Sequence, residues 1–155
     1  MITGVHHFSF SVSDINKTVE FFTKVLGMTI QSRGRNKSDT LGTKLFGTKW
    51  GYTQKSADLE VAVIKVGDSS VEFIEYKDPK PQPYHKNPSI AGSAHLAFEV
   101  DDIEKTREKL EAAGIEFHAP IDSYKESGEV TWKWCYFRGP DGLILELVEQ
   151  SEGWK

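Results

Sequence analysis

Hydrophobic and polar residues alternate over residues 7–12 and alternate again over residues 95–100. A period of two along the chain is typical of a strand with one buried face. Each alternating run leads into a segment with apolar residues at helical spacing, over residues 15–26 and 103–113. A glycine suited to ending a helix follows each segment: Gly27 and Gly114. The pattern predicts a strand, a helix and a second strand in each half of the chain.

The alternation returns near the end of each half as a hairpin. The first hairpin pairs residues 59–66 with residues 71–76, and the second pairs residues 131–137 with residues 143–148. Glycine, aspartate and proline occupy the turns between these strands, as hairpins require. The chain is therefore an internal repeat of a βαβββ unit, and we expect an α+β fold built from two such tandem modules.

The length of the chain and its connections indicate a single domain. A chain of 155 residues can bury one sizeable core. We expect module 1 at about residues 1–76, a proline-containing linker at about residues 77–92 and module 2 at about residues 93–150. Residues 33–52 are interpreted as a long basic loop, and residues 116–129 as a surface loop with a short strand at its start.

Strand alternation places four residues with metal-binding side chains on the face of the sheet opposite the helices. They come from four different strands and occupy matching positions in the two modules: His7, Glu72, His95 and Glu146. One histidine or glutamate alone is more often half-buried or solvated than a ligand. Two histidines and two glutamates related by the repeat favour a divalent-metal site. His6 and Glu75 fall on the other face and are interpreted as structural or solvated residues.

Composition narrows the partners of such a domain. The sequence has 19 Lys and Arg against 23 Asp and Glu, a formal net charge of −4, so neither nucleic acid nor a membrane surface is an expected partner. The single cysteine, Cys135, excludes an internal disulfide and a multi-cysteine zinc site, and it favours a cytoplasmic location. We expect no transmembrane helix, because no apolar stretch is long enough, and no signal peptide, because the first residues lack a basic segment followed by an apolar one.

Four segments of the sequence carry a resemblance to a known family. They are His7 to Ile15, Phe21 to Met28, His95 to Ile103, and Phe137 to Glu149 with its Pro-Asp-Gly turn. Together they resemble the vicinal oxygen chelate superfamily, which includes glyoxalase I, methylmalonyl-CoA epimerase, extradiol dioxygenases and bleomycin-resistance proteins. The resemblance implies that the two modules form a cupped mixed sheet with helices on the convex face, around a divalent metal such as Zn, Ni, Co, Mn or Fe. The ligand order His, Glu, His, Glu is most similar to glyoxalase I.

The ligand set and the resemblance lead to a hypothesis about the reaction. We expect a lyase or isomerase of glyoxalase I type, similar to lactoylglutathione lyase, in which Glu146 or Glu72 moves a proton next to a metal-bound carbonyl through an enediolate. The substrate would be a small hemithioacetal or thioester. Three alternatives stay open: an epimerase similar to methylmalonyl-CoA epimerase, an Fe(II) dioxygenase, and a metal-free small-molecule binding or resistance protein.

Basic residues in the long loop are the first candidates for binding the substrate. Arg33 and Arg35 lie at its start, and Lys37, Lys44 and Lys49 follow. Their charges suit the carboxylates of glutathione or the phosphates of coenzyme A. A basic loop is, however, more often only solvated than part of a binding site.

Aromatic residues of the second hairpin are the other candidates. Trp132 and Trp134 share one face of a strand with Tyr136, and they suit a pocket lining, the core or a subunit interface. We expect a homodimer, because an open sheet buries its edge by pairing. The four predicted metal ligands could then meet within one chain or across two.

Overall fold

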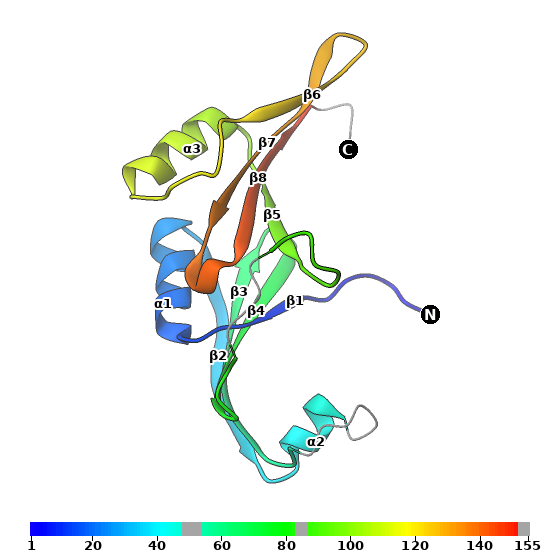
Figure 1. Cartoon of the computed structure of the whole chain (residues 1–155), viewed down its shortest axis with the longest axis vertical. Coiled ribbons are helices and arrows are strands. Elements are labelled where there is room, and N and C mark those ends of the chain that lie inside the picture. The colour runs from blue at the N-terminus through cyan, green and yellow to red at the C-terminus, as the bar shows by residue number, and fades with distance from the viewer. Residues whose placement is uncertain (48–53, 83–86, 152–155) are drawn as a thin grey trace. The chain divides into compact units, whose positions relative to one another are not determined.

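The computed structural model describes residues 1–47, 54–82 and 87–151. The chain divides into two compact units, Met1–Pro83 and Tyr84–Lys155 (Figure 1). None of the described helices is long and apolar enough to cross a lipid bilayer.

The first unit contains one four-stranded mixed sheet. Its elements are β1 (Phe8–Ser11), α1 (Ile15–Glu20), η1 (Phe21–Val25), β2 (Thr29–Ser38), α2 (Leu41–Phe46), β3 (Ala57–Val66) and β4 (Ser69–Asp78). The strand order is β1-β4-β3-β2. β1 runs parallel to β4, and the other two pairings are antiparallel.

The second unit repeats this topology. Its elements are β5 (His95–Glu99), α3 (Ile103–Ala112), β6 (Asp122–Glu126), β7 (Glu129–Arg138), η3 (Pro140–Gly142) and β8 (Ile144–Gln150). The strand order is β5-β8-β7-β6, again with one parallel pairing, between β5 and β8. The predicted α+β fold of two βαβββ modules is confirmed.

The start of each long helix is fixed in the same way in both units. Asp14 caps α1 by accepting the backbone N–H groups of Asn16 and Lys17, and Asp102 caps α3 by accepting that of Lys105. A glutamate from the sheet accepts the first N–H of each helix: Glu75 that of Ile15 at 3.0 Å, and Glu149 that of Ile103 at 2.8 Å. These contacts orient each helix on its sheet, and they give Glu75 a structural role.

Each helix packs on an apolar face of the sheet in its own unit. In the first unit Phe22 of η1 contacts Phe73 of β4, with ring centroids 4.5 Å apart, and both side chains are fully buried. In the second unit Ile103 of α3 and the strand residues Phe137 and Leu145 are buried. Because strand side chains alternate, the neighbours of these core residues, Glu72 and Glu146 included, project from the opposite faces.

Two connections differ from the sequence-based interpretation. Residues 33–38 were expected in a loop but belong to β2, and α2 follows at residues 41–46. A second strand, β6, lies at residues 122–126 rather than at the start of the 116–129 segment, where Phe117 makes only an isolated bridge. Nearly all residues of β2 and all of β6 are exposed, and most of them are polar, so no hydrophobic alternation marks these strands.

Gly42 provides a test of the packing of α2. A Cβ atom at this position would lie 2.5 Å from the backbone oxygen of Ser56 and 2.8 Å from that of Gln54. Gly42→Ala is therefore expected to destabilise the protein by about 1–3 kcal/mol in chemical denaturation, although alanine ordinarily favours a helix over glycine. Gly34→Ala is the matched control, because a Cβ atom added there would have nothing within 4 Å. Equal stability of the two variants would contradict this packing.

Candidate functional site

The first unit brings His7 and Glu72 together. His7 lies immediately before β1, and its Nε2 is 3.7 Å from Oε1 of Glu72 on β4. The hydroxyl of Ser9 donates to the same carboxylate oxygen at 2.9 Å. The Nδ1 atoms of His6 and His7 are 2.7 Å apart, a hydrogen bond that leaves Nε2 of His7 directed at the glutamate. His6, interpreted as structural or solvated, thus orients a predicted ligand.

The second unit brings His95 and Glu146 together. Nε2 of His95 is 3.0 Å from Oε2 of Glu146, and the glutamate side chain is only 8% exposed. Tyr136 on β7 forms a hydrogen bond with Glu146, and its ring packs edge-on against His95. Burial, followed by the carboxylate of Glu146, raises the pKa of the Tyr136 phenol, so this side chain stays protonated at neutral pH.

Strand register shows that these pairs are equivalent positions of the repeat. Glu72 lies opposite Ser9 in the pairing of β4 with β1, and Glu146 lies opposite Ala97 in the pairing of β8 with β5. In both units the histidine precedes that opposite residue by two positions and therefore projects from the same face. We call His7 with Glu72 the first half-site and His95 with Glu146 the second half-site.

The donor atoms of each half-site suit a divalent cation. Imidazole nitrogen and carboxylate oxygen are ordinary ligands of Zn, Ni, Co, Mn and Fe. Two such atoms on one ion, each roughly 2.1 Å from it and at a right angle, lie roughly 3 Å apart. The 3.0 Å separation in the second half-site matches this geometry, and the 3.7 Å separation in the first requires only a small side-chain movement.

A pocket of about 390 Å³ lies beside the second half-site, within the second unit. Its described lining residues are Pro88, Ser93, Ala94, His95, His118, Tyr136, Arg138 and Ile144. The volume is in the range of small-molecule sites. Of these residues, sequence reasoning singled out His95 as a ligand and Tyr136 as a possible lining residue. It missed His118 and Arg138 as pocket residues, because the internal repeat gives neither residue a partner in the first module.

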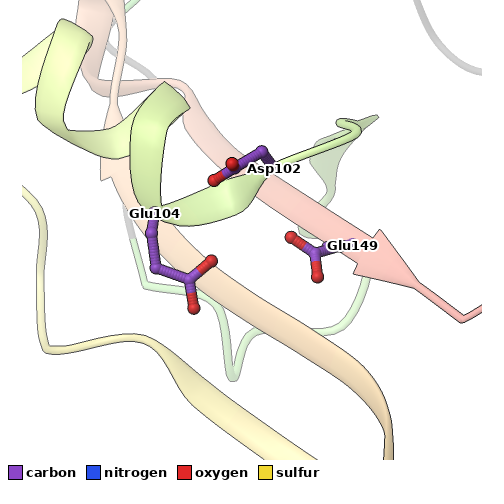
Figure 2. Close-up of side chains that lie close together, drawn as sticks. All are labelled: Asp102, Glu104 and Glu149. Carbon is purple, nitrogen blue, oxygen red and sulfur yellow. The ribbon is translucent and has the colours of Figure 1, made fainter.

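Three carboxylates form an acidic cluster outside the half-sites, two from the start of α3 and one from β8. Figure 2 shows Asp102, Glu104 and Glu149 directed toward one another. Lys133 Nζ lies 2.9 Å from Glu149 and 3.0 Å from Glu104, and Lys105 Nζ lies 2.6 Å from Asp102. Each of the three carboxylates is therefore already paired with a lysine ammonium group, and Lys133 serves two of them. The cluster is an ion-pair network that supports the start of α3.

The predicted substrate-binding arginines lie on a strand and not in a loop. Arg33 donates to Glu60 at 2.7 Å and to Asn16 of α1 at 2.5 Å. Arg35 donates two hydrogen bonds to Asp58, at 2.8 and 2.7 Å. The contact with Asn16 and the strand register place both arginines on the helix-bearing face, opposite the face of Glu72. Their role in substrate binding stays a prediction, and their position on the face opposite Glu72 does not favour it. Lys49, another predicted basic residue, lies outside the described residues.

The predicted aromatic residues occupy the half-buried end of β7. Trp134 lies opposite Val148 of β8 and Asp122 of β6, and Trp132 lies opposite Gln150 and Tyr124. Both share the face of Tyr136 but are not among the described residues that line the pocket. Cys135 alternates to the core side, where burial raises the pKa of its thiol to about 11. A thiol that stays protonated at neutral pH is a poor nucleophile.

The Arg35–Asp58 ion pair predicts an acid-dependent contribution to stability. The hydrogen bonds from Arg35 hold the pKa of Asp58 below its ordinary value of 3.8. A carboxyl group whose pKa is lower in the folded state stabilises the protein above its unfolded pKa, and this contribution is lost as the pH falls through the folded pKa. Asp58→Asn is therefore expected to lower the melting temperature at neutral pH, with a difference from the parent protein that shrinks below about pH 3.8.

Thermal unfolding by circular dichroism across this pH range measures the effect. Asp68→Asn, in the exposed turn between β3 and β4, is the matched control and is expected to behave like the parent protein throughout. A difference between Asp58→Asn and the parent that stays constant into strong acid would contradict the linkage.

The chain is similar to known proteins over nearly its whole length. Residues 4–147 match a family model described as the Glyoxalase/Bleomycin resistance protein/Dioxygenase superfamily. The chain is 28% identical over 152 residues to 2-epi-5-epi-valiolone epimerase from an Actinomyces species, covering 97% of this chain and 81% of that protein. It is 27% identical over 154 residues to a probable lactoylglutathione lyase from Vibrio parahaemolyticus, covering 94% and 90%. A solved glyoxalase family protein from Bacillus cereus shares the fold, with a TM-score of 0.79 at 20% identity over 97% of this chain and 95% of that chain.

Proposed function

Since the chain belongs to the Glyoxalase/Bleomycin resistance protein/Dioxygenase superfamily, we propose that it is a divalent-metal-dependent lyase or isomerase of glyoxalase I type, which transfers a proton next to a substrate carbonyl. The observation that carries this proposal is the pairing of one histidine with one glutamate at equivalent positions of both units. The residues proposed to hold the metal are His7, Glu72, His95 and Glu146.

The proposed proton transfer uses a glutamate carboxylate as the base. A divalent metal, when bound, supplies Lewis-acid polarisation of the carbonyl. Glu146 accepts the proton from the neighbouring carbon and returns it either to the adjacent carbon or to the opposite face of the same carbon. Tyr136 and His95 fix the position of this carboxylate, and its burial keeps bulk water away from the proton. Glu72, held by Ser9, is the equivalent candidate in the first unit.

Epimerase activity is the second candidate. It is supported by the relative named 2-epi-5-epi-valiolone epimerase, whose similarity extends over 97% of this chain. Removal of a proton next to a carbonyl is the first step of both reactions. The two differ only in where the proton returns, so the same residues serve either one.

Exchange of substrate hydrogen with solvent tests the proposal. The protein, loaded in turn with Zn, Ni, Co, Mn or Fe, is incubated in deuterium oxide with hemithioacetals of 2-oxoaldehydes, with acyl-CoA thioesters and with 2-epi-5-epi-valiolone. Proton NMR is expected to show loss of the carbon-bound hydrogen signal next to the carbonyl of one substrate class, and chelation is expected to abolish it. Exchange that survives chelation would contradict the proposal, and oxygen uptake with iron would favour a dioxygenase instead.

We also propose that the chain functions as a homodimer. Within the described residues each sheet has two edge strands, β1 and β2 in the first unit and β5 and β6 in the second, and exposed edges are commonly covered by pairing. Light scattering is expected to give about twice the 17.5 kDa mass of the chain. A monomer at micromolar concentration would contradict this expectation.

A further inference from the structure

The pocket beside the second half-site is lined by one cationic side chain, Arg138, as well as by His95. We propose that Arg138 and His118 form an oxyanion-binding subsite, which holds a carboxylate or phosphate group of the substrate. The inference deepens the proposed function, on which it rests for the location of the reacting carbonyl. It assigns a chemical class to the part of the substrate that does not react.

Strand register sets the distance between this subsite and the half-site. His95 of β5 lies opposite Ile144 of β8, which in turn lies opposite Arg138 of β7. The three residues form one row across adjacent strands, and all three line the pocket. Neighbouring strands are about 4.8 Å apart, so the backbones of His95 and Arg138 are roughly 10 Å apart. A substrate that reacts at the half-site and reaches the subsite therefore carries its oxyanion several bonds from the reacting carbon.

Two hydrogen bonds hold Arg138 in place. Its Nε donates to Nε2 of His118 at 3.1 Å, and its Nη1 donates to the backbone oxygen of Gly142 at 3.0 Å. The backbone of His118 is fixed as well, because its N–H donates to the carbonyl of Tyr136 at 2.8 Å. A guanidinium that is already oriented loses little entropy when it binds an anion.

The contact with Arg138 also determines the form of His118. Because Nε2 accepts a hydrogen bond, the ring is neutral and carries its proton on Nδ1. Burial, followed by the charge of Arg138, lowers the pKa of His118, which agrees with a neutral ring at physiological pH. His118 then offers an N–H donor next to the arginine cation, and a donor beside a cation suits an oxyanion.

The rest of the pocket is consistent with an anionic ligand. The whole chain has a net charge of −4, yet none of the described lining residues is a carboxylate. Pro88, Ala94 and Ile144 supply apolar surface, and Ser93 supplies a hydroxyl. Among these described lining residues an anion meets hydrogen-bond donors and the Arg138 cation, and the Glu146 carboxylate lies behind His95 at the half-site.

Titration with simple anions tests the subsite without any need for metal or turnover, so its outcome is independent of the proposed reaction. Inorganic phosphate and acetate are added separately to the full chain at constant ionic strength, and backbone amide signals are followed by NMR. We expect saturable shifts at His118, Arg138 and Gly142 with at least one anion. Phosphate alone indicates a phosphate-bearing substrate, acetate alone indicates a carboxylate, and either result supports the subsite.

Variants separate specific binding from general attraction. Arg138→Gln is expected to raise the dissociation constant about tenfold or more, as loss of a charge-assisted hydrogen bond predicts. Arg138→Lys is expected to recover part of the affinity. His118→Phe, which keeps a ring at this position and removes its N–H donor, gives a second measurement if the Arg138 variants fold poorly. Lys125→Gln removes a positive charge from β6 outside the pocket and is expected to leave binding unchanged.

Two results would overturn the inference. The first is the absence of saturable shifts at these residues with either anion at tens of millimolar. The second is an equal loss of affinity in Lys125→Gln and in Arg138→Gln, which would mean that the anions respond only to net charge. Where the Arg138 variants fold poorly, an affinity of His118→Phe equal to that of the parent protein would likewise overturn the subsite.

Discussion

Replacing Glu146 with glutamine is expected to lower the rate of the proposed reaction by roughly 10²–10⁴-fold, the usual contribution of a general base. Glutamine preserves the size of the side chain but cannot accept the proton, and its amide meets the two groups that now contact the carboxylate, His95 Nε2 and the Tyr136 hydroxyl. Steady-state kinetics and the solvent-exchange rate measure the effect on the substrate class that the exchange experiment identifies.

Two further glutamate variants show whether the loss of activity is specific to Glu146. Glu126→Gln, at an exposed position of β6, is expected to retain full activity. Glu72→Gln tests the equivalent carboxylate, and the larger loss of exchange rate identifies the base. If Glu146→Gln and Glu72→Gln both turned over at the parent rate with metal bound, glutamate-based proton transfer at the half-sites would be wrong.

The repeat made much of the fold predictable. The predicted first helix, over residues 15–26, corresponds to α1 and η1, and both predicted hairpins are present. These elements bury one face, so their sequences show the periodicity of the structure they form. β2 and β6 bury almost nothing, and they are held by pairing with β3 and β7 instead. Their existence depends on partners elsewhere in the chain, so no local pattern marks them.

The alternation of side chains along a strand also allows the sequence to distinguish glutamates that contact a helix from glutamates that are candidate metal ligands. Glu72 and Glu75 are three positions apart on β4 and therefore project from opposite faces. Glu75 contacts the start of α1, whereas Glu72 contacts His7. Glu146 and Glu149 repeat this division on β8. The sequence alone thus predicted that Glu72 and Glu146 project from the face opposite the helices.

The same reasoning could not identify the pocket. Positive charge alone makes Arg33 and Arg35 candidates for substrate binding. In the structure, however, their guanidinium groups form ion pairs with Glu60 and Asp58 of the adjacent strand. Arg138 and His118 are 20 positions apart in the sequence. Their side chains meet because the backbone N–H of His118, in the segment before β6, donates a hydrogen bond to the carbonyl of Tyr136 on β7. Such a contact depends on the course of an irregular segment, which has no periodicity to interpret.

Metal binding is expected to have the second large effect, on stability as well as on activity. A ligand that binds only the folded protein stabilises it by about 2.7 kcal/mol at a concentration one hundred times its dissociation constant. For a chain of this size that corresponds to a rise in melting temperature of roughly 5–10 °C. Chelation followed by dialysis is expected to remove both the rise and the exchange activity, and thermal unfolding with each added metal measures the recovery.

Single-ligand variants test whether both half-sites contribute to that effect. His7→Ala removes a nitrogen donor from the first half-site and His95→Ala removes one from the second, so each is expected to reduce the metal-induced rise in melting temperature. His118→Ala, which removes a pocket histidine outside both half-sites, is expected to keep most of it. A loss confined to one of the two ligand variants would restrict the metal site to that half-site. Full retention in both would show that the metal binds elsewhere, and the pairing of histidine with glutamate would then need another explanation.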